Sequence, residues 1–391
     1  MSAPYPALDS FLDEAGTDGY LLDADGSDSD QAYLSGFRAP GHFLTLYADA
    51  EVRLLVPDLE YTRAVDESDA EDVTPFSALD YGATVAEYGR AKAKPLVAAA
   101  FLAEAGVESI SVPVGFPTGT AEVLREQGIE VVPDYDDAVG RVRAVKSDRE
   151  IEHIAATQAA AEDALAVAEE LLARASVDDG VLRLDGAVLT SERVREEIRS
   201  HLREAGYEPQ ECIVASGAEG ALGHASGSGP IDAGDPIVVD IAPQDEASGY
   251  FGDVTRTFLK DEPDGWTRER YDLTREAHAA ALDAIEPGVT GEAVNEVVCD
   301  VFEREGYPTL RTDESTSDGF TSSTGHGVGL ALHERPKLSW GGEELQPGHV
   351  VTVEPGLYEE GVGGVRLEDL IVVTDEGYEN LNEYPRDLRV V

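Results

Sequence analysis

An internal repeat constrains this chain more than any other feature. Residues 189–207, LTSERVREEIRSHLREAGY, and residues 289–307, VTGEAVNEVVCDVFEREGY, align at an offset of 100. Both segments have a threonine near the start, apolar residues at helical spacing and a Gly-Tyr end, so we predict two amphipathic helices. Two copies of one unit predict a domain built from related halves around a pseudo-twofold axis.

The repeat continues into strands that carry acids. IVVDIAP places Asp240, and VVTVEPG places Glu354, six residues after a glycine in each copy. A second strand follows each, with Asp253 13 residues past Asp240 and Glu368 14 residues past Glu354. A carboxylate in an apolar strand costs free energy unless it is paired or binds a cation. Four matched acids therefore favour one or two divalent metal ions over a salt-bridge network.

Two histidines lie seven residues apart in SSTGHGVGLALHERP, namely His326 and His333. Alone, such a pair more often has a structural or surface role than a catalytic one. Beside four acids, His326 is predicted to be the nitrogen ligand of an oxygen-rich site. This donor set indicates a site for Mn²⁺, Co²⁺, Fe²⁺ or Zn²⁺ rather than a closed zinc site built from cysteines.

The first 140 residues alternate strand-like and helix-like segments. YLLDA, FLTLYA, VRLLVP, SISVP and IEVVP indicate strands, and residues 84–106 and TGTAEVLREQG indicate helices. Short loops between them predict an α/β domain, to which we assign no chemistry. Ser147 and Glu150 form a capping-box pattern that opens a helix to about Arg174. We therefore place the domain boundary between residues 145 and 146.

The motifs DIAP…GYFGDVTRTF, GHGVGLALHERP, VEPG and VRLEDL resemble those of the metallopeptidases of pita-bread fold. That family includes Xaa-Pro dipeptidase (prolidase), aminopeptidase P, methionine aminopeptidase and the metal-free hydrolase creatinase. The resemblance covers the whole chain and is to the two-domain branch. It implies an α+β chain, with a creatinase-like α/β domain over 1–145. A pita-bread domain over 146–391 would have a pseudo-twofold repeat and a curved antiparallel sheet.

The resemblance also implies the site. Asp240, Asp253, His326, Glu354 and Glu368 would hold two divalent ions, with Asp253 and Glu368 bridging them. We expect Mn²⁺, with Co²⁺, Zn²⁺ or Fe²⁺ as alternatives. The family usually separates its two aspartates by eleven residues, whereas thirteen separate them here. Because the extra pair lies in the turn-like PQDEASG, it should preserve the face that each strand presents.

Three further residues match catalytic or substrate-binding positions of the family. His224 and His333 would hydrogen-bond the substrate and its oxyanion, and Arg366 would contact the substrate carboxylate or brace the ligands. Glu354 would also act in catalysis, by transferring the proton of the attacking water. The structural alternatives are a surface loop for His224, an interior hydrogen bond for His333 and a salt bridge for Arg366.

The resemblance implies a dinuclear-metal exopeptidase that hydrolyses Xaa-Pro bonds of dipeptides or peptide N-termini through a metal-bridging hydroxide. Two alternatives are a creatinase-like, metal-independent amidinohydrolase and a non-enzymatic binding module of the same fold. All five ligand positions are filled, which speaks against both. The ligand set does not distinguish a dipeptidase from an aminopeptidase.

Charge restricts the partners. The chain has 79 acidic and 29 basic residues, for a formal net charge of −50. Such a surface repels nucleic acid and anionic lipid, so we expect neither as a partner. The family resemblance implies a small peptide as substrate. The composition resembles that of proteins from salt-accumulating halophiles. The chain has no long apolar run, no evident signal segment and only two cysteines, and these features predict a cytoplasmic protein. We also expect a homodimer.

Overall fold

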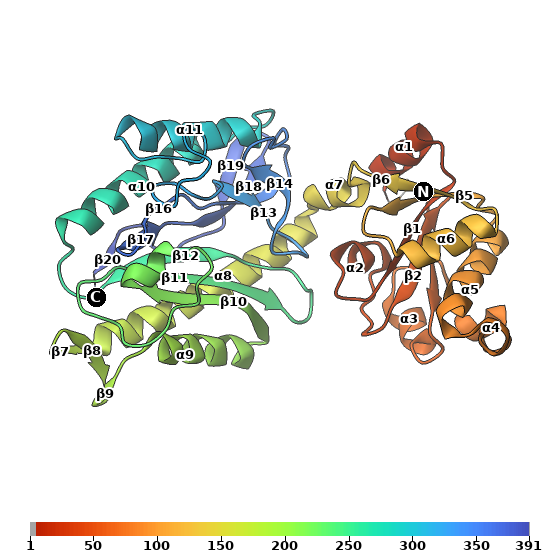
Figure 1. Cartoon of the computed structure of the whole chain (residues 1–391), viewed down its shortest axis with the longest axis horizontal. Coiled ribbons are helices and arrows are strands. Elements are labelled where there is room, and N and C mark those ends of the chain that lie inside the picture. Colours follow the sequence, from red (N-terminus) through yellow and green to blue (C-terminus); the bar gives the residue numbers. More distant parts are fainter. Residues whose placement is uncertain (1–4, 391) are drawn as a thin grey trace. The chain divides into compact units, whose positions relative to one another are not determined.

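The computed structural model describes residues 5–390, and the contacts divide the chain into two compact units, Met1–Arg143 and Ala144–Val391 (Figure 1). The first unit contains a six-stranded sheet of order β4-β3-β2-β1-β5-β6. Its strands are β1 (Gly19–Ala24), β2 (Phe43–Ala48), β3 (Glu51–Val56), β4 (Asp72–Pro75), β5 (Ser109–Pro113) and β6 (Glu130–Asp134). Two apolar cores lie in this unit, as expected of an α/β domain.

The helices of the first unit are α1 (Pro6–Ala15), α2 (Ser29–Ser35), α3 (Tyr61–Glu67), α4 (Tyr81–Tyr88), α5 (Arg90–Glu104), α6 (Thr118–Glu126) and α7 (Ala138–Ala144). The single helix predicted over residues 84–106 is wrong, because α4 ends and α5 begins at Gly89. Gly89 has φ +81°, a conformation that interrupts a helix and that glycine adopts at little cost.

The second unit opens with α8 (Asp148–Arg174), and its predicted capping box is confirmed. Ser147 Oγ accepts a hydrogen bond from Glu150 N, and Glu150 Oε2 accepts one from Ser147 N at 2.8 Å. In the first half, α8 and α9 (Ser191–Glu204) share an apolar core with β10 (Tyr207–Ser216), β11 (Ile237–Asp245) and β12 (Val254–Leu259). A small sheet of β7 (Ser176–Asp178), β8 (Val181–Leu184) and β9 (Ala187–Val188) lies between α8 and α9 in the chain.

The second half repeats this plan. Helices α10 (Gly265–Ala284) and α11 (Gly291–Arg304) share a core with a sheet of order β14-β13-β15-β18-β19. Its strands are β13 (Gly325–Gly327), β14 (Glu334–Leu338), β15 (Val350–Val353), β18 (Asp369–Thr374) and β19 (Gly377–Asn380). The hairpin of β16 (Gly356–Glu359) and β17 (Gly363–Arg366) was not predicted from the sequence. β20 (Arg389–Val390) pairs with β12 in the first sheet, β10-β11-β12-β20.

The two predicted repeat helices are confirmed as α9 and α11. Thr190 and Thr290 cap them, each accepting a hydrogen bond through Oγ1 from a backbone N–H three residues on. Gly206 and Gly306 follow their last turns with φ of +89° and +87°. Threonine caps at the starts and glycines with positive φ at the ends of both helices explain why the two segments match in sequence at their ends.

The two halves of the second unit meet at β12, which contacts the segment from β17 to β18. Glu368 N donates to Thr255 O at 3.2 Å, and Arg366 N donates to Thr257 Oγ1 at 3.1 Å. This seam brings the acids of the two halves together. Across residues 5–390, no helix is long and apolar enough to cross a membrane.

Candidate metal centre

All eight residues singled out in the sequence line one cavity of the second unit. The cavity is bounded by Glu211, His224, Asp240, Asp253, His326, Leu332, His333, Glu354, Arg366 and Glu368. Asp240 lies within β11 and His326 within β13, whereas Asp253, Glu354 and Glu368 directly flank strands. Both halves of the repeat therefore contribute side chains to the site.

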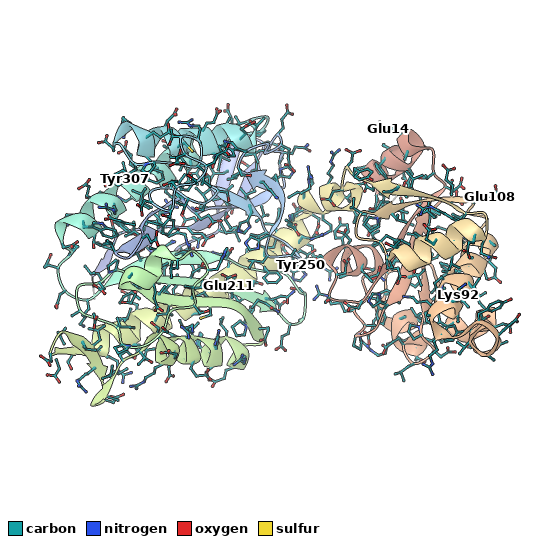
Figure 2. The ribbon with its side chains drawn as sticks, viewed as in Figure 1. Glu14, Lys92, Glu108, Glu211, Tyr250 and Tyr307 are labelled. Atoms are coloured by element: carbon teal, nitrogen blue, oxygen red, sulfur yellow. The ribbon has the colours of Figure 1, made fainter. Side chains whose placement is uncertain are left out.

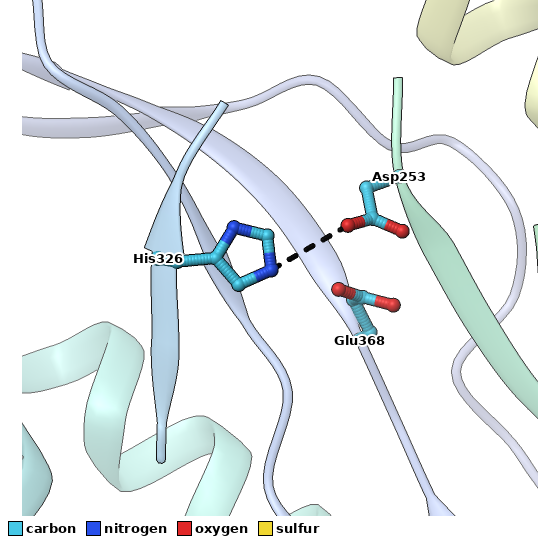
Figure 3. A group of neighbouring side chains, drawn as sticks. All are labelled: Asp253, His326 and Glu368. Carbon is cyan, nitrogen blue, oxygen red and sulfur yellow. Dashed lines mark ion pairs between the residues drawn. The ribbon is translucent and has the colours of Figure 1, made fainter. Parts of the chain in front are cut away.

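Asp253, His326 and Glu368 form the tightest group, with one possible ligand atom from each lying within 4.8 Å of the others (Figure 3). His326 Nε2 is 3.7 Å from Asp253 Oδ2. The other ring nitrogen, Nδ1, lies 3.1 Å from Gly327 O and donates to it. This bond fixes the neutral tautomer that leaves Nε2 free as a ligand, and burial lowers the pKa of His326, which also favours the neutral ring.

Glycines on both sides of His326 allow its strand to pack closely. A Cβ at Gly325 would lie 2.0 Å from Thr352 O, and one at Gly327 would lie 2.1 Å from Arg335 O. Any other residue at either position would push β13 away from its neighbours. The GHG sequence is therefore required by the approach of strands that places the imidazole in the cavity.

Asp253 and Glu368 are almost fully buried, with 5 % and 2 % exposure. Gln158 of α8 holds the backbone of Asp253, accepting from its N–H at 2.7 Å and donating to its carbonyl at 2.9 Å. Thr255 Oγ1 donates to Glu368 Oε2 at 2.7 Å. These bonds fix the backbone of Asp253 and the direction of the Glu368 carboxylate, and the two carboxylates lie close enough to share an ion.

Electrostatics favour cation binding by this group. Burial, followed by the charge of Glu368, raises the pKa of Asp253 well above its usual range. Burial, followed by the charge of Glu354, does the same for Glu368. Burial also raises the pKa of Glu354 to about 7. Crowded carboxylates repel one another in a weakly solvated cavity, and divalent ions with oxygen and nitrogen ligands would neutralise them, so the donor set fits the implied metal centre.

Glu354 lies next to His326, whose Nε2 is 3.3 Å from Glu354 Oε1. Thr352 links the two residues, because its Oγ1 accepts from His326 N at 3.1 Å and donates to Glu354 Oε1 at 3.3 Å. Glu354 therefore adds a fourth possible ligand beside the group of three.

Asp240 lies outside the group of three and pairs with Arg366 Nη2. The other guanidinium nitrogens are also engaged, since Nε donates to Thr255 Oγ1 at 3.2 Å and Nη1 to Tyr358 OH at 3.1 Å. A buried arginine with all three nitrogens bonded to the protein is fixed in place. The contacts favour the bracing role for Arg366 over a direct bond to a substrate carboxylate.

His333 and His224 are exposed residues at the cavity wall. The ring centroid of His333 is 4.2 Å from that of His326. Partial desolvation of the ring against the cavity wall, followed by the charge of His326, lowers the pKa of His333. His224 follows the 3₁₀ turn Gly217–Ala221. Both imidazoles can meet a ligand that enters the cavity.

Asp240 and Asp253 lie on either side of a hairpin whose tip contains the segment predicted to hold the two extra residues. β11 continues to Asp245, whose N–H donates to Tyr250 O at 3.0 Å across the turn. Asp240 pairs in register with Thr255, two residues after Asp253. An even number of added residues therefore leaves both acids facing the cavity.

Sequence reasoning missed Glu211, Tyr358 and Gln158. Glu211 gave only a weak signal, as an acid directly before the apolar run CIVA, which does not alternate and so does not show which face Glu211 occupies. Tyr358 and Gln158 gave no such signal, since their partners Arg366 and Asp253 are distant in the chain.

Comparisons with known proteins agree with this geometry. Residues 152–375 match the model of metallopeptidase family M24, and residues 6–145 match the Creatinase/Prolidase N-terminal domain. A Xaa-Pro dipeptidase of Pyrococcus horikoshii is 28% identical over 391 residues, covering 99% of each chain. A probable dipeptidase PepE of Mycobacterium bovis is 34% identical over 289 residues, or 71% of each chain.

Solved structures share the fold. A prolidase from Pyrococcus horikoshii superposes with a TM-score of 0.79 at 28% identity, covering 98% of this chain and 99% of that one. A Xaa-Pro dipeptidase from Bacillus anthracis superposes with a TM-score of 0.81 at 26% identity, covering 99% of each chain. The predicted pita-bread fold and family resemblance are thus confirmed, and the chain belongs to metallopeptidase family M24.

Proposed function

We propose that this protein is an exopeptidase that hydrolyses Xaa-Pro bonds with two divalent ions. Asp240, Asp253, His326, Glu354 and Glu368 would be the ligands. The observation that carries the proposal is the convergence of these five residues, from both halves of the repeat, on one cavity. The names of the relatives supply the substrate class. Catalysis is assigned to residues 146–391, and no chemistry to residues 1–145.

Bound at these ligands, divalent ions would activate the attacking water and polarise the scissile carbonyl. The protein supplies the rest. Glu354, next to His326, would take the proton of the attacking water and pass it to the proline nitrogen. His224 and His333 would donate hydrogen bonds to the substrate and to the developing oxyanion, and losing one such donor costs roughly 10²–10³ in rate.

An assay on metal-depleted protein tests the proposal. The protein is reloaded with Mn²⁺ in molar KCl and given Leu-Pro, a longer peptide that begins Leu-Pro, and Leu-Ala. We expect Mn²⁺-dependent hydrolysis of Leu-Pro well above that of Leu-Ala. The longer peptide separates an aminopeptidase from a dipeptidase. No hydrolysis of either Leu-Pro substrate with any of Mn²⁺, Co²⁺, Zn²⁺ or Fe²⁺ would refute the proposal.

A pair of variants links activity to the cavity. Glu368→Gln removes one proposed bridging charge, whereas Glu379→Gln removes an exposed charge from β19 of the same sheet. We expect only Glu368→Gln to abolish hydrolysis. Equal activity in the two variants would contradict the assignment of Glu368.

We also infer manganese as the bound metal, a homodimer and a cytoplasmic location. Only the sequence and the resemblance support these three inferences. Metal analysis of protein purified from its own host would test the first. Light scattering in molar KCl would test the second, and cell fractionation the third.

A further inference from the structure

Glu211 is an acid of the cavity wall that the proposed metal centre does not use. It lies on β10 of the second unit (Figure 2). Its neighbours Cys212 and Val214 are in the apolar core behind the sheet. Because successive strand residues point to opposite faces, Glu211 is on the cavity face, together with Ile213.

The register of the sheet brings Glu211 close to Asp240. Ile213 pairs directly with Asp240, and Glu211 pairs with Ala242 on the adjacent strand β11. Glu211 and Asp240 are therefore diagonal neighbours on one face, a separation that long side chains span.

Among residues 5–390, the positive charges nearest the carboxylate of Glu211 are those of Arg366 and of His224 when protonated, and neither forms an ion pair with it. Arg366 is the one lysine or arginine that lines the cavity, and its nitrogens are bonded to Asp240, Thr255 and Tyr358. No ion pair or side-chain hydrogen bond of Glu211 occurs within the described part of the chain. A half-buried carboxylate without a partner is costly, and a cationic group of a ligand would remove that cost.

The proposed substrate carries one obligatory cation in the right place. The α-ammonium nitrogen of an Xaa-Pro dipeptide is two bonds from the scissile carbonyl carbon. Any residue that binds it must therefore line the same cavity as the proposed metal ligands, as Glu211 does. We propose that Glu211 binds the free α-amino group of the substrate and so selects peptides with an unblocked N-terminus. This inference rests on the proposed function.

Two substrates of the same shape test the role of Glu211. Phe-Pro carries the α-amino group, and 3-phenylpropionyl-proline lacks it. For Glu211→Gln we expect KM for Phe-Pro to rise roughly tenfold, the loss of one hydrogen bond to a charged group, with kcat changed much less. Hydrolysis of 3-phenylpropionyl-proline should not change. A matched control is Glu208→Gln, which removes a charge from the same strand outside the cavity.

A loss of kcat/KM that is equal for both substrates, or no loss for either, would overturn the inference. Metal content is measured in parallel, and a fall in bound metal in Glu211→Gln would also overturn it, by showing that Glu211 acts through the ions. Calorimetric titration with phenylalanine and 3-phenylpropionate tests the same discrimination without turnover. If the parent protein cleaves neither peptide, the proposed function fails. Even then, tighter binding of phenylalanine than of 3-phenylpropionate by the parent, and loss of this preference in Glu211→Gln, would support the role of Glu211.

Discussion

Replacing Arg256 by methionine should strongly destabilise the second unit. Arg256 lies on β12, is fully buried, and donates hydrogen bonds from all three of its nitrogens. Nε bonds to Pro385 O at 2.9 Å, and Nη2 bonds to Tyr384 O at 3.0 Å. Nη1 bonds to Thr255 O at 2.9 Å and to Glu368 O. The guanidinium thus ties the first sheet to the segment that carries a proposed metal ligand and to the C-terminal segment.

The expected magnitude follows from Asp369. Its carboxylate is fully buried and accepts from Arg256 Nη2 at 2.8 Å. Removing one partner of a buried pair costs about 3–5 kcal/mol, because the other charge remains buried. Asp369 would keep its contacts with Arg386 and Asn380, so we expect a loss near 3 kcal/mol.

Arg386→Met is the matched control for this substitution. Arg386 pairs with the same carboxylate, but its side chain is 41% exposed. A pair with one partly exposed member contributes less, and we expect Arg386→Met to cost about 1 kcal/mol or less. The comparison separates the effect of burial from the effect of removing a positive charge beside Asp369.

Tryptophan fluorescence during urea unfolding is a suitable assay. Both tryptophans of the chain, Trp266 and Trp340, lie in the second unit, so the signal reports on that unit alone. Measurements on metal-free protein in molar KCl avoid a contribution from bound ions. A free energy of unfolding for Arg256→Met within about 1 kcal/mol of the parent would refute this reasoning. So would an equal loss in Arg386→Met.

Three further predictions concern the metal, salt and pH. Glu368→Gln should bind at most one ion per chain, and two bound ions would contradict this prediction. Its metal-free form should unfold at the same or a higher urea concentration than the metal-free parent, because one repulsive charge is gone. With a net charge of −50, the protein should have a higher Tm in 3 M than in 0.1 M KCl, and an equal or lower Tm would show that charge repulsion is unimportant. Burial lowers the pKa of His349 from 6.5 to about 4. As the pH drops, the unfolded chain therefore binds a proton at this residue before the folded chain does. The free energy of unfolding should fall between pH 6.5 and pH 4, by up to roughly 3 kcal/mol for this residue. His349→Asn keeps an acceptor for Gln346 N–H. If the unfolding free energies of the parent and of this variant differ by the same amount at pH 6.5 and at pH 4, His349 does not cause the loss of stability.

The sequence was most informative where residues repeat. Matching helices and acids in the two halves indicated the paired architecture, because each half must satisfy the same packing and capping requirements. The family resemblance placed all eight predicted site residues, and the structure puts them at one cavity. Their assigned roles stay predictions until activity and metal content are measured.

The sequence was least informative where partners are far apart in the chain. Arg256 sits in the strand VTRTFL, whose alternation does not identify Asp369 or Pro385 as its partners. The hairpin β16–β17 was missed, because VEPGLYEEGVGGVRLEDL has too few apolar residues in alternation to define two short strands. Local patterns report propensity and burial, whereas a long-range hydrogen bond depends on how sheets meet.

The division of the proposed ligands between the halves has a physical consequence. Asp240 and Asp253 belong to the first half, and His326, Glu354 and Glu368 belong to the second. Each half has its own apolar core behind its sheet, so hydrophobic burial stabilises each half separately. The polar seam between them contains crowded acids that repel one another, opposed by Arg366 and Arg256. Metal ions bound there would convert this repulsion into attraction across the seam. Metal binding should therefore stabilise the association of the two halves more than it stabilises either apolar core. The rigidity of the seam should then depend on the bound ions.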